Sequence, residues 1–316
     1  MDGKLLKRAT SNSAEKQPIV TIGVPTYNRA KSLTVALESI ATQTYKNLEI
    51  IVSDNASTDE TQEVVGNFSV KDKRILYFRQ PRNIGANENF KFVLSQARGK
   101  YFIWFADDDT CSPRFIEQLV MCLDRHEDVV LAMTDVNYLD EVHDKASRIC
   151  LDRLRIENLN ARWWKARMRF FSFPTYPDIL HAIYGLYRTD ILRSCKLDFE
   201  SKWVKGTVHG GEAHILAQIA TFGKVVSIPI ALKTYRYHHD SIFVKGIKRS
   251  NWDRLLRGAE VRINLNRVAL QSRLSGWARL GLVIWTWTHL LLQTSRTVVA
   301  VQFIYRRFFP NSKQRG

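Results

Sequence analysis

The chain has 316 residues, a formal net charge of +16, and 45% hydrophobic against 25% charged residues. These proportions exclude an intrinsically disordered chain and allow one large α/β domain or two smaller ones. The basic excess is concentrated near the C-terminus, because basic residues outnumber acids by 12 from Lys245 onward. Charge alone is compatible with a nucleic-acid-binding or membrane-binding module, so other features must decide the function.

The cysteines and the N-terminus indicate a cytoplasmic protein. No Cys-x-x-Cys pair occurs among the four cysteines, so neither a zinc site nor a disulfide scaffold is predicted. Residues 1–17 are polar, and we expect a flexible tail there. This tail contains no apolar run of the kind found in a secretion signal.

The chain between residues 18 and 135 alternates short apolar runs with amphipathic segments. The apolar runs predict strands at Ile19–Val24, Leu48–Val52, Arg74–Phe78, Tyr101–Phe105 and Val129–Thr134. Apolar residues at helical spacing predict helices at Ala30–Thr42, from Asp59 with Ser57 or Thr58 as its cap, at Asn87–Ala97 and at Phe115–Leu123. This alternation is typical of an α/β protein with a mostly parallel sheet covered by helices on both faces.

The pattern is weaker in the second half of the chain. Residues 136–176 are charged and aromatic, and we interpret them as an insertion or a mobile lid. Further on, the sequence predicts a strand at Ile183–Tyr187, a helix at Glu212–Thr221 and a strand at Val225–Ile230.

The last 70 or so residues mix arginine, tryptophan and leucine. Leu280–Ser295 contains no Asp, Glu, Lys or Arg, but it is shorter than the ~20 residues that span a bilayer. We expect amphipathic helices on an anionic membrane surface, with Trp277, Trp285 and Trp287 at the interface. The alternative is that these helices are core helices packed on the rest of the protein.

Three adjacent carboxylates directly follow a predicted buried strand in Phe105-Ala-Asp-Asp-Asp-Thr110. Adjacent like charges repel and lose hydration near a low-dielectric core, so a cation is the simplest compensation. Pro25–Asn28 and Ser53–Asn55 also follow predicted strands. Because ligands of parallel sheets bind outside the carboxyl ends of the strands, we expect these three polar clusters to meet at one sheet edge.

Four segments, in their order and spacing, resemble family-2 glycosyltransferases. They are Val20-Thr-Ile-Gly-Val-Pro-Thr-Tyr-Asn-Arg29, Ile50-Ile-Val-Ser-Asp-Asn-Ala-Ser-Thr-Asp59, Asn83-Ile-Gly85 with Asn89, and Trp104-Phe-Ala-Asp-Asp-Asp109. The resemblance covers residues 18–135 well and 180–241 loosely. It implies a GT-A catalytic domain over 18–245, with a nucleotide-sugar half (18–135) and an acceptor half (136–245). Residues 246–316 would then form a basic, aromatic-rich, membrane-associating helical region.

The resemblance also implies roles for individual residues at the donor site. The positions that match nucleotide contacts are Pro25, Thr26, Tyr27, Asp54, Asn55, Asn83 and Asn89. The acidic motif would hold Mg²⁺ or Mn²⁺ on the donor diphosphate, and oxygen ligands suit both ions. Ala106 occupies the first acidic place of the family motif, so Asp108 and Asp109 are the expected metal-contacting pair, with Asp107 second.

Other positions depart from the family pattern or are less specific. Relatives often carry Ala-Arg-Asn where this chain has Asn87-Glu-Asn89, and Arg82 is a candidate substitute for the missing arginine. His238, in Tyr235-Arg-Tyr-His238, is a candidate to complete the metal shell or to touch the diphosphate.

The catalytic base is expected at the start of a helix in the acceptor half. Gly210-Gly-Glu-Ala-His214 keeps the glutamate of a Glu-Asp pair found in relatives and has alanine in place of the aspartate. Glu212 is therefore the candidate to deprotonate the acceptor hydroxyl. His209 and His214 are the alternatives.

Together these features predict an inverting, metal-dependent glycosyltransferase that uses a nucleoside-diphosphate sugar. The acceptor is expected to be a glycan or lipid-linked glycan of cell-surface polysaccharide synthesis, at the inner face of the cell membrane, with no nucleic-acid partner. One alternative is a non-catalytic nucleotide- or membrane-binding scaffold of the same fold. Another is a sugar nucleotidyltransferase, which predicts an early Gly-rich loop where this chain has Pro-Thr-Tyr-Asn.

Overall fold

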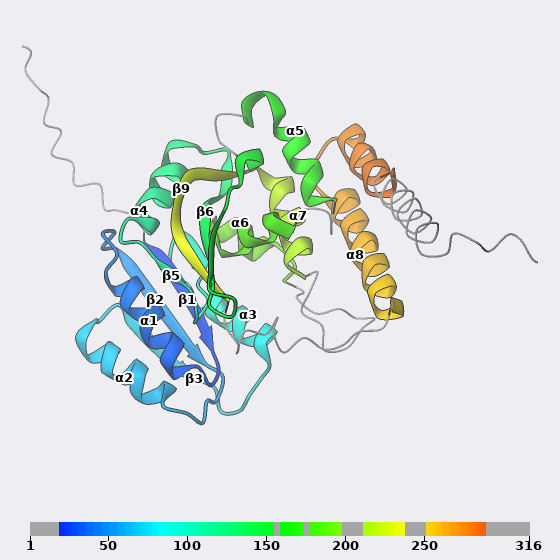
Figure 1. Cartoon of the computed structure of the whole chain (residues 1–316). Coiled ribbons are helices and arrows are strands. Elements are labelled where there is room, and N and C mark those ends of the chain that lie inside the picture. Colours follow the sequence, from blue (N-terminus) through cyan, green and yellow to red (C-terminus); the bar gives the residue numbers. More distant parts are fainter. Residues whose placement is uncertain (1–18, 155–158, 173–176, 198–210, 238–250, 289–316) are drawn as a thin grey trace, which may run out of the picture.

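The computed structural model describes residues 19–154, 159–172, 177–197, 211–237 and 251–288. The expectations for the N-terminal tail, for His209 and His238, and for the end of the C-terminal region therefore lie outside the described residues. Figure 1 shows an α/β arrangement in the N-terminal half, with further helices beside it.

The first part of the chain alternates strands and helices. Its elements are β1 (Val20–Thr26), α1 (Ala30–Ala41), β2 (Leu48–Asp54), α2 (Thr61–Lys71), β3 (Ile75–Arg79), α3 (Ala86–Gln96), β4 (Tyr101–Trp104), β5 (Thr110–Cys111), α4 (Phe115–Arg125) and β6 (Val129–Asp140). After these come β7 (Lys145–Ile149), the 3₁₀ helix η1 (Asp152–Leu154), α5 (Leu159–Phe170), the 3₁₀ helix η3 (Pro177–Tyr184), β8 (Leu186–Arg188), α6 (Thr189–Ser194), α7 (Gly211–Phe222), β9 (Lys224–Tyr237) and α8 (Asn251–Gln271). A further helix covers 276–288.

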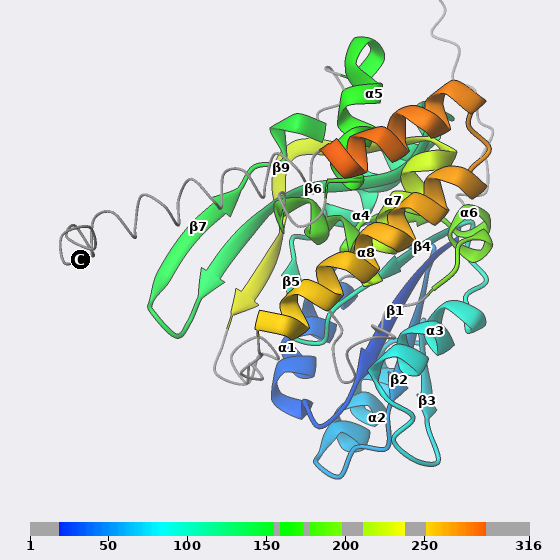
Figure 2. The same ribbon diagram turned by 90° about the vertical axis from the view of Figure 1, so that its right-hand side faces the viewer.

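The strands form one sheet in the order β3-β2-β1-β4-β8-β6-β9-β5, with β7 paired to β6. The strands β3, β2, β1 and β4 are parallel, and β6 is parallel to β9. The strand β8 is antiparallel to both β4 and β6. Helices α1 and α2 cover one face of the N-terminal strands and α3 covers the other, as Figures 1 and 2 show. The expected α/β architecture, with helices on both faces of the sheet, is thereby confirmed.

The central strands are buried on both faces. Every residue of β1 and β2 is buried, which accounts for the near-continuous apolar runs in their sequences. Gly23 lets α3 approach β1 closely, because a Cβ at this position would lie 2.8 Å from Val93 Cγ2. This packing fixes the loops that follow β1 and β2 at the carboxyl edge of the sheet.

Several elements differ from the sequence-based expectations. Helix α2 begins at Thr61 instead of Asp59, and no side chain caps it from its N-cap residue. The strand predicted at Ile183–Tyr187 is 3₁₀-helical up to Tyr184 and extended from Leu186. The strand β9 runs past Ile230 to Tyr237, because β6 and β5 supply backbone pairing there.

Residues 136–149, expected to start an insertion or lid, belong to the sheet. They continue β6 and turn back as β7, so that Val136 pairs with Ile149 and Asp140 with Lys145. The β7 arm of this hairpin is mostly exposed, which accounts for its charged residues.

Candidate functional site

The acidic triplet and the end of β1 are joined by two side-chain contacts. The Thr26 hydroxyl donates a hydrogen bond of 2.6 Å to Asp107 Oδ2. The Arg29 guanidinium forms an ion pair with Asp108, with 2.9 Å between Nη1 and Oδ2. Two of the polar clusters that the sequence places after strands therefore lie together at one edge of the sheet.

The third carboxylate of the triplet points elsewhere. Asp109 is fully buried, and its Oδ2 lies 2.8 Å from Nζ of Lys233, whose side chain is 6% exposed. The Arg236 amide donates to Asp109 Oδ1 at 3.3 Å. Each member of the triplet thus has its own partner: a hydroxyl for Asp107, a guanidinium for Asp108 and an ammonium for Asp109.

The electrostatics of this edge favour an additional cation. Burial and the neighbouring Asp108 charge raise the pKa of Asp107 to about 7. Burial also raises the pKa of Asp109, although the Lys233 ammonium acts in the opposite direction. A carboxylate whose ionised form is disfavoured in this way is stabilised when a positive charge binds beside it.

The side chains at this edge can supply part of a metal shell. Among the residues that the structure describes, no group of three His, Cys, Asp or Glu side chains could hold a metal ion unaided. Mg²⁺ and Mn²⁺ are commonly held by one or two carboxylates, with substrate phosphates and water completing the shell. The oxygen atoms of Asp107 and Asp108 fit such a partial site.

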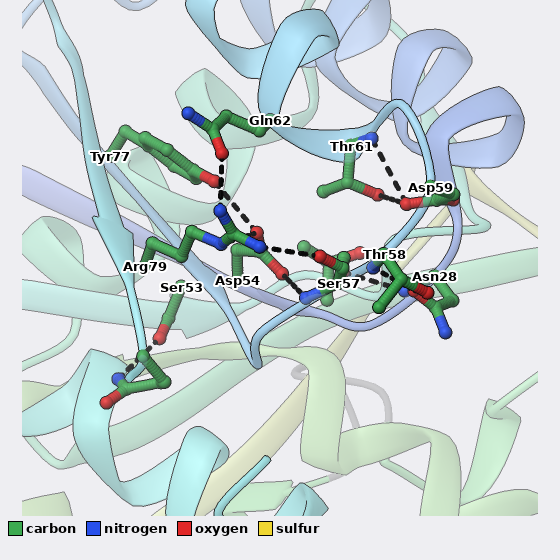
Figure 3. Close-up of polar contacts among 12 residues, drawn as sticks. Asn28, Ser53, Asp54, Ser57, Thr58, Asp59, Thr61, Gln62, Tyr77 and Arg79 are labelled. Carbon is green, nitrogen blue, oxygen red and sulfur yellow. Dashed lines mark hydrogen bonds and ion pairs between the residues drawn. The ribbon is translucent and has the colours of Figure 1, made fainter. Parts of the chain in front are cut away.

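A second network surrounds Asp54 at the end of β2 (Figure 3). Asp54 is fully buried, and its Oδ1 accepts a hydrogen bond of 2.8 Å from the Ser57 amide. Its Oδ2 accepts a hydrogen bond of 2.8 Å from the Tyr77 hydroxyl and lies 3.6 Å from Arg79 Nε. Burial and these contacts with Asp54 raise the pKa of Tyr77. The Asp54 carboxylate therefore fixes the loop between β2 and α2 to the neighbouring strand β3.

Asp59 connects the starts of two helices beside this network (Figure 3). Its Oδ2 accepts a hydrogen bond of 2.9 Å from the Ala30 amide, the first residue of α1. Its Oδ1 accepts one of 3.1 Å from the Thr61 amide, the first residue of α2. The Thr61 amide of α2 is thus capped by Asp59, and the prediction of Ser57 or Thr58 as the capping residue was wrong.

Three asparagines expected near the nucleotide tie the loops together. Asn55 Nδ2 donates to Asn83 Oδ1 at 2.9 Å, and the Ile84 amide donates to Asn55 Oδ1 at 2.8 Å. Asn89 is buried on α3, where its Oδ1 accepts from the Ser53 hydroxyl at 2.6 Å and its Nδ2 donates to the Ser53 carbonyl at 2.9 Å. These contacts position the loops, and whether the same amides face a nucleotide stays a prediction.

Pro25 and Tyr27 flank Thr26 at the end of β1 but differ in exposure. Pro25 is buried in the β1–β2 ladder, opposite Ser53. Tyr27 follows the strand, and 44% of its surface is exposed. An exposed ring at the carboxyl end of a central strand is available to stack against a planar group such as a nucleotide base.

Glu212 lies in the first turn of α7. Burial, together with the charges of Asp109, Glu212 and Asp108, raises the pKa of Tyr184 far above its usual range. The charges of Glu212, Asp108 and Asp109 therefore act on the same tyrosine. His214 lies in the same helix, partly buried.

Comparison with known proteins identifies the fold and the family. Residues 21–193, more than half of the chain, match the sequence profile described as Glycosyl transferase family 2. The chain belongs to this family. An uncharacterized glycosyltransferase of Haemophilus influenzae is 27% identical over 271 residues, which cover 81% of this chain and 80% of the relative. The sequence resemblance to family-2 glycosyltransferases is therefore confirmed.

A more specific name belongs to a relative that matches a shorter segment. The GalNAc(5)-diNAcBac-PP-undecaprenol beta-1,3-glucosyltransferase of Campylobacter jejuni is 46% identical over 93 residues, 29% of this chain and 30% of the relative.

Solved structures share the fold at low sequence identity. Staphylococcus aureus TarS in complex with UDP-GlcNAc has a TM-score of 0.62 at 16% identity, with 86% of this chain and 72% of that chain covered. The mannosyltransferase PcManGT of Pyrobaculum calidifontis, in complex with GDP-Man and Mn²⁺, has a TM-score of 0.53 at 15% identity, with 94% of this chain and 82% of that chain covered.

The sequence interpretation gave no role to several residues that organise this site. Arg29 ends the motif Val20–Arg29, and its pairing with Asp108 depends on the spatial approach of β1 and β4. Lys233 lies beyond the predicted end of its strand. A strand prediction continued through Tyr235 would have put Lys233 on β9, and the β5–β9 pairing then places it beside the acidic triplet.

Proposed function

We propose that this family-2 glycosyltransferase transfers a sugar from a nucleoside-diphosphate sugar to an acceptor hydroxyl with inversion at the anomeric carbon. The observation that carries the proposal is the joined edge of β1 and β4, where Thr26 and Arg29 contact Asp107 and Asp108. This edge offers both carboxylates for a cation and a guanidinium for phosphate. A scaffold without donor chemistry would leave this acidic edge without a use.

In the proposed donor site the nucleotide lies over the loops after β1 and β2. The exposed Tyr27 ring would stack on the base, and the loop fixed by Asp54 and Asn55 would contact the base or ribose. Structural neighbours in complex with UDP-GlcNAc and with GDP-Man support a nucleotide-sugar donor. Asn83 and Asn89 would then hold these loops in the conformation that receives the nucleotide.

The diphosphate is proposed to lie at the acidic edge, near Arg29. Asp107 and Asp108 would hold Mg²⁺ or Mn²⁺, and the crystallised mannosyltransferase with GDP-Man and Mn²⁺ supports this choice of ion. When bound, such an ion neutralises charge that develops on the departing nucleoside diphosphate. The Arg29 guanidinium adds a second positive charge on the same side.

Glu212 is the proposed general base. Its carboxylate accepts the proton of the acceptor hydroxyl while that oxygen forms a bond to the anomeric carbon. The bond between the anomeric carbon and the diphosphate oxygen breaks, and the nucleoside diphosphate leaves with the bonding electron pair. Because the nucleophile and the leaving group lie on opposite sides, the configuration at the anomeric carbon inverts.

The acceptor is proposed to be a lipid-linked glycan of cell-surface polysaccharide synthesis, reached from the membrane surface. On the helix 276–288, four large apolar residues at helical spacing are exposed: Trp277 (85%), Leu280 (48%), Ile284 (52%) and Trp287 (50%). We call these four residues the tryptophan stripe. A stripe of this kind suits the interface of a membrane, and the basic excess from Lys245 onward suits anionic lipid. The undecaprenol-linked acceptor in the name of the Campylobacter jejuni relative supports the same class of acceptor.

Within the described residues, no helix has the length and hydropathy needed to cross a membrane. The tryptophan stripe supports a peripheral contact in the proposal. The opposite side of the same helix is anchored to the protein, since Leu282 is fully buried and Trp285 Nε1 donates to Ser172 Oγ at 2.6 Å.

The direct test is product formation. The full-length protein is incubated with UDP-, GDP-, dTDP- and CDP-sugars, Mn²⁺ and vesicles that carry sugars linked to polyprenyl diphosphate. Mass spectrometry of the lipid fraction is expected to show the addition of one sugar, with Asp108→Asn inactive. A donor that binds without any sugar transfer to the lipid-linked acceptors would contradict the proposed acceptor class, and donors that do not bind would contradict the transferase site.

A further inference from the structure

A buried lysine of β9 lies against the acidic triplet. The Lys233 side chain is 6% exposed, and its ammonium pairs at 2.8 Å with the fully buried Asp109 carboxylate. The same ammonium lies 4.0 Å from the centre of the Tyr184 ring and 5.5 Å from that of Phe105. Backbone pairing keeps it in place, because Lys233 is opposite Cys111 in the β5–β9 ladder.

The environment of this lysine requires a negatively charged partner. An ammonium removed from water is strongly destabilised unless a carboxylate compensates it, and removal of either partner leaves a buried unpaired charge. The faces of Tyr184 and Phe105 add cation–π attraction. Asp109 is fully buried, whereas Thr26 and Arg29 contact Asp107 and Asp108 at the end of β1.

Both oxygens of Asp109 have partners from one strand. Lys233 holds Oδ2, and the Arg236 amide donates to Oδ1 at 3.3 Å. The turn that carries the acidic triplet is thereby attached to β9 through side-chain and main-chain contacts.

We propose that Lys233 is the internal counter-ion of Asp109, and that Asp109 is a positioning residue of the acidic turn and not a ligand of the metal ion. The inference rests on the proposed donor site, in which Asp107 and Asp108 hold the cation. It assigns the three adjacent carboxylates two different tasks. Asp109 fixes the turn to β9, and the other two are presented to the donor.

The proposal predicts that the Lys233–Asp109 pair contributes to folding without metal or donor. The test is a double-mutant cycle with Lys233→Met, Asp109→Asn and the double variant, in the full chain with chelator present. Lys224→Met is the matched control, since Lys224 pairs at 2.6 Å with Asp128 near the surface, with side chains 21% and 58% exposed. The urea midpoint is measured for each variant. Lys233→Arg tests whether any positive charge at this position gives the midpoint of the wild type.

Lys233→Met is expected to lower the urea midpoint more than Lys224→Met does, because it leaves a buried carboxylate unpaired. The double variant, which removes both charges, is expected to recover much of that loss. An Lys233→Met midpoint equal to that of Lys224→Met would overturn the proposal. If Lys233→Met does not fold, the double variant is compared with Asp109→Asn instead. The proposal requires the double variant to be the more stable of the two, because Asp109→Asn leaves the buried ammonium unpaired.

Metal binding separates the two roles of the triplet. In the presence of UDP or GDP, the electron paramagnetic resonance signal of free Mn²⁺ gives the dissociation constant of Mn²⁺ from the protein. The double variant, whose net charge is unchanged, is expected to stay within about threefold of the wild type, while Asp108→Asn weakens binding by about tenfold or more. A double variant as weak as Asp108→Asn would show that Asp109 is a ligand. If the wild type binds no Mn²⁺ with either nucleotide, the donor-site proposal fails, and the urea midpoints still test the counter-ion role.

Discussion

The Thr26 hydroxyl donates a 2.6 Å hydrogen bond to Asp107, although 81 residues separate the two in sequence. The contact joins the end of β1 to the acidic turn after β4, and it leaves the rest of the Asp107 carboxylate to other partners. In the proposed donor site, Thr26 therefore orients a carboxylate that faces the cation. Outer contacts of this kind contribute strongly to metal affinity in proteins.

Thr26→Val is expected to weaken metal-dependent nucleotide binding by about tenfold, because the Asp107 carboxylate loses the donor that orients it. Valine has nearly the same shape, so the sheet should fold normally. Calorimetric titration of UDP and GDP with Mn²⁺ measures the effect, and Thr26→Ser serves as the control that keeps the hydroxyl. Equal affinities for the valine variant and the wild type would show that this hydrogen bond has no part in donor binding.

Glu212→Gln is expected to lower kcat by about 100-fold or more, because an amide cannot accept the acceptor proton. The dissociation constant for the donor should change little, since the glutamate lies on the acceptor side in the proposal. Single-turnover transfer assays separate the two quantities. His214→Gln and His209→Gln test the alternative bases, and a full loss of kcat in either of them, with an active Glu212→Gln, would contradict the assignment.

Asp59→Ala is expected to lower the free energy of unfolding by about 2 kcal/mol near neutral pH, because α1 and α2 both lose an acceptor for a first-turn amide. Urea unfolding measures the change. Glu63→Ala, an exposed acid in the first turn of α2, is the control, with little effect expected. A loss no larger than that of the control would show that the double cap does not stabilise the fold.

The contribution of Asp59 to the free energy of unfolding should also depend on pH. Burial alone would raise the pKa of Asp59, but hydrogen bonds from Thr61 and Ala30 lower it below its ordinary value of 3.8. The carboxylate therefore stabilises the folded state above pH 3.8 and loses this contribution as the pH falls through its lower folded-state pKa. The difference in stability between wild type and Asp59→Ala is expected to shrink in acid, and a difference that grows instead would contradict this account.

The tryptophan stripe is expected to bind anionic vesicles. Trp277→Ser combined with Trp287→Ser should reduce partitioning onto phosphatidylglycerol vesicles by about tenfold or more, because two exposed indoles are lost from the proposed interface. Co-sedimentation measures the partitioning, with phosphatidylcholine vesicles as the neutral comparison. Val70→Ser, an exposed apolar position (72%) on α2, is the matched control. Unchanged vesicle binding in the double variant would contradict the membrane role of the stripe.

The N-terminal sheet could be predicted closely from the sequence because its signals are local. Strands such as β1 and β2 are buried on both faces, so their sequences are nearly continuous apolar runs. The positions of these strands, and of the loops after them, can therefore be predicted from the sequence. The meeting of Thr26 with the acidic triplet was an expectation of parallel-sheet topology, and the structure places them in contact.

Other parts of the site depend on contacts that local sequence does not encode. Asp59 caps α1 across a loop from α2, and Tyr77 reaches Asp54 from the next strand. In the sequence, Lys233 is not distinguished from the other basic residues. Its role becomes visible only from the pairing of β9 with β5. Such contacts depend on strand order, which periodicity and residue type leave open.

The central claim is that the joined edge of β1 and β4 binds a nucleoside-diphosphate sugar together with a metal ion. Its most direct test is titration calorimetry of UDP, GDP, dTDP and CDP and their sugars, with Mn²⁺ and then with chelator, on the wild type and Asp108→Asn. We predict that one nucleotide binds in the presence of Mn²⁺, and that binding is lost with chelator and in the variant. Absence of binding by every nucleotide under both conditions would contradict the account and favour a scaffold of the same fold.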